Sequence, residues 1–173
     1  FFGGNVPIPI SHLFLSKESE IHRAPRQKDI NDMSKGWPSL DIKISEIPHV
    51  DYPEDQTREM NEDIDLVKSC FFNPMCDSRF LETSNEKPFS LFKKYVEDNE
   101  LEYDIDNLDQ INEDLASLIL NLKYKYNRPR PKKYMKTRDI SFPYDRVRES
   151  GTPSYPSGHA AHAFFNAAMI SKE

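Results

Sequence analysis

One strongly periodic segment constrains the fold of this chain more than any other feature. Apolar side chains recur at steps of three and four between Leu108 and Tyr126. This spacing puts them on one face and predicts an amphipathic helix over about residues 108–126. The candidate N-cap residues are Asp106, Asn107 and Asp109. Two prolines follow, Pro129 and Pro131, and we expect them to end the helix.

Further helices are predicted before and after this segment. Periodic apolar residues indicate helices from Thr57 to about Cys70 and from Phe89 to about Asn99. The alanine-rich segment 157–170 is interpreted as a buried helix. Residues 1–56 hold six of the 13 prolines, which makes long regular elements hard to place there. We therefore expect an all-α fold: an irregular arm over residues 1–56 and a helical domain over residues 57–173.

Composition and cysteine spacing exclude several classes of protein. The 23 Lys and Arg against 29 Asp and Glu give a net charge of -6, which argues against a nucleic-acid binder. No run of about 18 apolar residues occurs, so we expect no membrane span and a soluble protein. Cys70 and Cys76 match neither a zinc knuckle nor a redox pair, and we interpret them as free buried thiols, with a local disulfide as the alternative.

The arm contains His12, His22, His49 and the single tryptophan, Trp37. Without paired ligand spacing these are predicted to be packing or surface residues, and no metal site is expected.

Two short segments carry the residue types that bind an oxyanion. Lys123 lies in the last turn of the long predicted helix, and Arg130 follows just beyond its end. A point charge and a planar guanidinium fork of this kind suit phosphate. Ser157 is placed to cap the alanine-rich helix, whose first turn then presents free N–H groups to an anion. Gly158 lets an anion approach the backbone closely, and His159 is suited to protonate a leaving oxygen.

Both segments together resemble a known superfamily. Lys123, separated by six residues from Arg130-Pro131, and the later Pro156-Ser157-Gly158-His159 are similar to the first two signature motifs of the type 2 phosphatidic acid phosphatase superfamily. That superfamily includes the class A acid phosphatases and the vanadium-dependent haloperoxidases. Counting back seven positions from Arg128 gives Asn121 rather than a lysine, so Arg130 is the matching arginine and Arg128 an auxiliary charge.

The resemblance implies a helical bundle of the acid phosphatase and haloperoxidase type that acts on a phosphorylated small molecule. Lys123 and Arg130 would bind phosphoryl oxygens, while Ser157 and the N–H of Gly158 complete the cradle. His159 would be the general acid. A phosphatase of this type is expected to need no cofactor, whereas a haloperoxidase would hold vanadate in the same cradle.

A third family motif, with an arginine, a nucleophilic histidine and an aspartate, is not found in the 14 residues after His159. His162 follows on the same helix without an aspartate after it, and we expect it to be a packing residue rather than the nucleophile. We therefore expect a phosphatase whose nucleophile lies outside this chain, which would be a piece of a longer polypeptide. Two alternatives stay open: a haloperoxidase, and a non-enzymatic subunit of a homo-oligomer or larger assembly, such as a virus particle, held through the arm.

Overall fold

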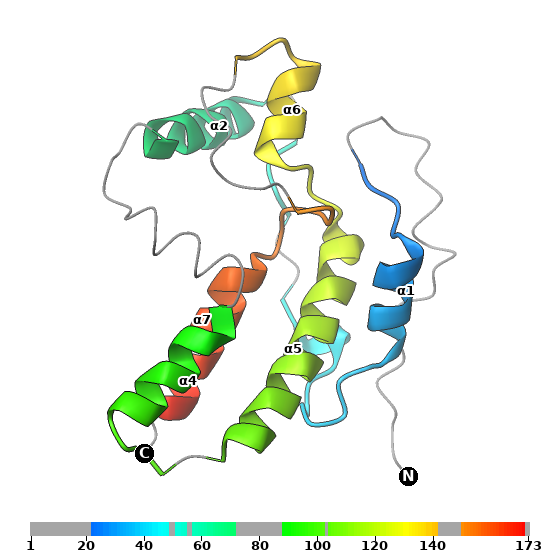
Figure 1. Ribbon diagram of the computed structural model, residues 1–173. Coiled ribbons are helices and arrows are strands. Elements are labelled where there is room, and N and C mark those ends of the chain that lie inside the picture. Colours follow the sequence, from blue (N-terminus) through cyan, green and yellow to red (C-terminus); the bar gives the residue numbers. More distant parts are fainter. Residues whose placement is uncertain are drawn as a thin grey trace.

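The computed structural model describes residues 22–48, 51–54, 57–71, 88–102, 104–141 and 150–171, and these ranges contain helices and no strands (Figure 1). The helices are α1 (Gln27–Ser34), α2 (Arg58–Phe71), α4 (Pro88–Asp98), α5 (Ile105–Tyr126), α6 (Pro131–Thr137) and α7 (Gly158–Ile170), with a short 3-10 helix, η2 (Ile44–Glu46). The predicted all-α fold is thereby confirmed. None of the described helices is long and apolar enough to cross a membrane.

Several predictions concern residues outside the described ranges. They are the arm before residue 22, His12, His49, Cys76 and the domain boundary at residue 56. The side chain of Cys70 is likewise not described.

The long helix α5 begins three residues earlier than the periodic pattern indicates. The side chain of Asp104 accepts a hydrogen bond from the Asn107 backbone N–H at 3.0 Å and caps the helix. The expected caps were therefore wrong, because all three candidates lie inside the helix. Its end is set by Asn127, in the left-handed conformation with φ 46°, before the prolines are reached. Pro131 instead begins α6, where its missing N–H costs no helical hydrogen bond.

Helix α1, which the sequence analysis did not predict, lies along α5 (Figure 1). Two α5 side chains hold it: Ser117 Oγ donates to the carbonyl of Asp32 at 3.0 Å, and Asn121 Nδ2 donates to the carbonyl of Met33 at 3.2 Å. The main core lies beside this contact, and its buried members are Trp37, Leu40, Leu115, Leu118, Ile119 and Leu122. Part of the predicted arm is thus packed into the helical body. The expectation that Trp37 is a packing residue is confirmed.

A second cluster joins α2 to α6 beyond the C-terminal end of α5 (Figure 1). Met60 and Ile64 of α2 pack there against Tyr134 and Met135 of α6. The start and end of α2 agree with the predicted helix to within one residue.

Helix α7 does not have the environment that its composition predicts. It packs against α5 and α4 on one side, and Asn166 is its only fully buried described residue. Phe164 is 81% exposed. The exposed alanines beside it are Ala160, Ala163, Ala167 and Ala168. The expectation of a buried helix was therefore wrong: an apolar composition shows that a helix can be buried, but only neighbouring elements bury it.

Candidate functional site

Two segments far apart in the sequence meet at the C-terminal end of α5. Lys123 Nζ donates hydrogen bonds to the carbonyls of Pro153, at 3.0 Å, and Pro156, at 2.6 Å. Arg130 Nε donates to the carbonyl of Thr152 at 2.7 Å, and its Nη2 lies 3.4 Å from the carbonyl of Pro153. Both predicted cations therefore contact the segment that leads into α7.

Ser154 fixes the same junction from the other side. Its backbone N–H donates to the carbonyl of Arg128 at 2.9 Å, and its hydroxyl donates to the carbonyl of Pro129, also at 2.9 Å. Arg128 itself forms an ion pair with Asp63 of α2. This pair ties α2 to the junction, and the role of Arg128 as an auxiliary charge stays a prediction.

The segment ends at the N-terminus of α7. Ser157 caps this helix as predicted, with its hydroxyl oxygen accepting from the Ala160 N–H at 3.3 Å. Helix geometry leaves the N–H groups of Gly158 and His159 outside the intrahelical ladder, directed out of this end. A Cβ at Gly158 would meet only Ile119 Cγ2, at 4.0 Å, so packing does not require a glycine there. His159 is exposed.

Lys123 is only 7% exposed, and this burial changes its pKa. Desolvation, with the positive charge of Arg130 second, lowers the pKa of Lys123 to about 8. A bound anion would favour the charged ammonium and offset part of this burial cost.

The family model of the PAP2 superfamily, the type 2 phosphatidic acid phosphatases, matches residues 114–172. The match covers 59 of the 173 residues, about a third of the chain. The match contains all five predicted site residues and confirms the resemblance seen in the motifs. No curated protein and no solved structure matches the chain.

Inside the segment that the family model matches, His162 is part of a buried polar cluster that the sequence did not predict. Asn112 Nδ2 donates to the backbone carbonyl of Leu108 at 2.8 Å, which fixes the orientation of this amide because a carbonyl can only accept. The amide oxygen of Asn112 then lies 2.9 Å from His162 Nδ1, so that nitrogen carries the hydrogen. Asn112 and Asn166 also exchange two side-chain hydrogen bonds, at 2.8 and 2.9 Å.

The surroundings of His162 favour the neutral form of its imidazole. Burial, and secondly the charge of His159, lower its pKa. With Nδ1 engaged by Asn112, the lone pair of the neutral ring is on Nε2. The half-buried position and this hydrogen bond agree with the expectation that His162 packs between the helices. The only sequence signal for the cluster is that Asn112 shares the helix face of the apolar residues.

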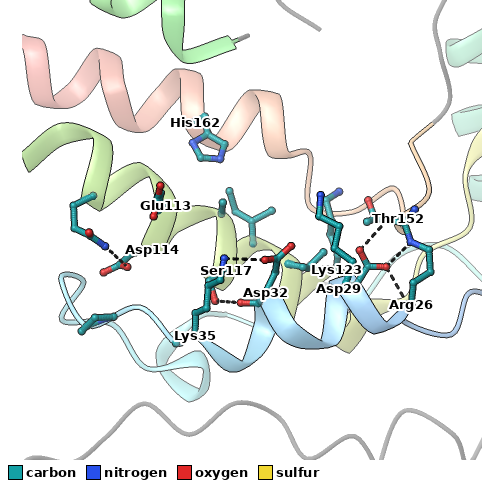
Figure 2. A pocket seen from close by; sticks show the side chains of 17 residues that line it. Arg26, Asp29, Asp32, Lys35, Glu113, Asp114, Ser117, Lys123, Thr152 and His162 are labelled. Atoms are coloured by element: carbon teal, nitrogen blue, oxygen red, sulfur yellow. Dashed lines mark hydrogen bonds and ion pairs between the residues drawn. The ribbon is translucent and has the colours of Figure 1, made fainter. Parts of the chain in front are cut away.

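A cavity of about 590 Å³ extends from Lys123 and Thr152 along α1 and α5 to His162 (Figure 2). At the Lys123 end, the carboxylate of Asp29 accepts hydrogen bonds from Arg26 Nε and from the hydroxyl of Tyr124, both at 2.8 Å. The Arg26 hydrogen bond lowers the pKa of Asp29, while burial raises the pKa of Tyr124. This end of the cavity therefore already has a paired carboxylate, and the Arg26 guanidinium is committed to it.

The described residues contain no group of three or more His, Cys, Asp or Glu side chains that could hold a metal ion. His22 lies elsewhere, with its Nδ1 2.9 Å from the carbonyl of Asn127. The structure thus brings Lys123 and Arg130 to the segment before Ser157, Gly158 and His159. The roles of these five residues toward phosphate stay predictions.

Proposed function

We propose that this protein is a phosphoric ester hydrolase of the phosphatidic acid phosphatase type, acting on a phosphorylated small molecule. The observation that carries the proposal is the contact of Lys123 and Arg130 with the backbone of residues 152–156, next to the N-terminus of α7. The PAP2 match over residues 114–172 supports the class of enzyme.

The substrate phosphate would lie between the two cations and the helix end. An ammonium has three N–H donors, and the two carbonyl contacts of Lys123 leave the third for a phosphoryl oxygen. The outward N–H groups of the first turn of α7 and the helix dipole add to the attraction. Arg130 would supply the charge-assisted hydrogen bonds that hold the phosphate most strongly.

In the reaction, a histidine nitrogen attacks phosphorus, the phosphorus–oxygen bond to the alcohol breaks, and His159 gives its proton to the departing alkoxide. Water then hydrolyses the phosphohistidine. We assign the nucleophile to a histidine outside these 173 residues, because the Nδ1 of His162 is bound to the amide of Asn112 and no aspartate follows His162 to orient it as a nucleophile. The fixed cations and the helix dipole would stabilise the charge that develops on the phosphoryl oxygens.

Binding of inorganic phosphate, measured by isothermal titration calorimetry, tests this proposal. Arg130→Ala should weaken binding roughly 10- to 100-fold, the range expected for loss of a hydrogen bond to a charged group. Arg130→Lys should lose less, because it keeps the charge and loses only the fork. The matched control is Lys125→Ala, an exposed cation at the same end of α5, which should leave affinity unchanged.

Equal phosphate affinity in wild type and Arg130→Ala would remove Arg130 from the site. Two further assays separate the alternatives. Peroxide-dependent halide oxidation after addition of vanadate would indicate a haloperoxidase. Failure to bind either phosphate or vanadate would favour the non-enzymatic assembly subunit.

A further inference from the structure

A second cavity, of about 220 Å³, lies where α2 meets the segments 128–131 and 154–157. Three apolar side chains from one face of α2 line it: Met60, Ile64 and Val67. The other lining residues include Pro129, Tyr134 and Tyr155. This cavity is separate from the larger one beside α1, with which it shares no lining residue.

Three polar residues in its wall, Asp63, Arg128 and Ser154, already have partners inside the protein. Asp63 and Arg128 form an ion pair with each other, and the Arg128 guanidinium lies 5.6 Å from the centroid of the Tyr52 ring. The hydroxyl of Ser154 donates to the carbonyls of Arg128 and Pro129. A ligand group in this cavity would therefore gain mainly apolar contacts, which favours a hydrocarbon or aromatic group over a polar one.

The position of the cavity connects it with the proposed phosphate site. Ser157, the N-cap of α7, lines it, and so do Pro129 and Pro131 on either side of Arg130. A group bound here would thus be next to a phosphate held at the start of α7. An apolar cavity of about 150 Å³ is large enough to bind benzene, so 220 Å³ accommodates a single ring with a short substituent.

We propose that this cavity binds the organic group of the substrate, and that the substrate is a phosphate monoester of an aromatic, single-ring alcohol. The inference rests on the proposed function, because it requires the phosphate to be at the N-terminus of α7. Val67, Met60 and Ile64 provide the apolar wall, and the tyrosine rings provide edges or faces against which an aromatic ring packs.

Two non-hydrolysable ligands test the inference without relying on turnover. Phenylphosphonate and methylphosphonate carry the same anionic group and differ in the ring. We expect phenylphosphonate to bind at least about tenfold more tightly than methylphosphonate, because the ring removes apolar surface from water. Inorganic phosphate, titrated in parallel, reports on the anion site alone.

A variant that fills the cavity locates the effect. Val67→Phe should abolish the preference for the phenyl ligand while leaving the affinity for inorganic phosphate unchanged. Leu66→Phe is the matched control, since Leu66 is the neighbouring α2 residue, is 62% exposed and does not line the cavity. Circular dichroism and thermal unfolding check that each variant folds, and Val67→Met serves as a smaller filling substitution if Val67→Phe does not fold.

The outcomes distinguish the two proposals. Binding of phosphate and both phosphonates with equal affinity would overturn the aromatic-substrate inference and leave the phosphate site standing. A phenyl preference that survives in a folded Val67 variant would overturn the location. If none of the three anions binds, the proposed function fails, and this inference fails with it.

Discussion

The buried ammonium of Lys123 should make the stability of the protein depend on pH in a specific window. Its pKa is about 8 in the folded protein, against 10.5 for an ordinary lysine. The unfolded chain therefore holds this proton at pH values where the folded protein has lost it. Stability then rises with pH between these two values, which is the direction expected when the unfolded state binds more protons. Below the folded pKa the full cost of the buried charge is present.

The magnitude follows from the two pKa values. Between about pH 7 and about pH 9.5 the contribution of Lys123 to the free energy of unfolding should increase by roughly 2 kcal/mol. Urea unfolding at the two pH values measures it. Tyr124 has the opposite effect above about pH 10, because its raised pKa keeps the phenol protonated in the folded protein while the unfolded chain loses this proton, and stability then falls. Both pH values of the experiment lie below that range.

Substitution assigns the effect to one side chain. Lys123→Met removes the titrating group, so the rise should disappear, whatever the change in absolute stability from the lost contacts with Pro153 and Pro156. Lys125→Met, two residues further along α5 and exposed, should keep it. A rise that persists in Lys123→Met would refute the reasoning. If that variant does not fold, competitive acetylation of the wild-type lysines with mass spectrometry measures the Lys123 pKa directly.

Two further substitutions test the elements that surround the site. Asn166→Ala removes a side chain that is 0% exposed and leaves buried partners on Asn112 and His162 without hydrogen bonds, so urea unfolding should show a loss of about 3 kcal/mol. A loss below about 0.5 kcal/mol, the range expected for the exposed control Ala167→Ser, would contradict the importance of this cluster. Gly158→Ala should leave the melting temperature nearly unchanged, because the added Cβ would have Ile119 Cγ2 as its nearest neighbour, at 4.0 Å. The same substitution should weaken phosphate binding measured by calorimetry, because the methyl group keeps an anion away from the backbone. Unchanged phosphate affinity would show that the anion does not approach this backbone.

Local sequence was enough to predict the longer helices. Periodic apolar residues placed α2, α4 and α5 with starts and ends that agree with the structure to within three residues. The same approach missed α1 and α6, which have eight and seven residues. Such short helices offer at most two turns of periodic pattern, and they form because they pack on α5 and on α2, respectively.

Some features of the candidate site could be predicted from the sequence, and others could not. The motif spacing identified Lys123 and Arg130, the cap at Ser157 and the PAP2 resemblance, because these depend on residue types at fixed positions along the chain. The exposed face of α7 and the cluster of His162 with Asn112 could not be predicted from the sequence, because each depends on which element lies opposite.

Sequence by itself therefore determined the longer helices and the presence of Lys123 and Arg130 at the end of one of them. Tertiary structure alone decided that the Lys123 ammonium is buried against the carbonyls of residues 153 and 156. It also decided that an apolar cavity lies beside the cap of α7. The physical reason is that helix propensity and charge belong to single residues and their near neighbours, whereas desolvation and cavity shape arise only when distant segments pack together.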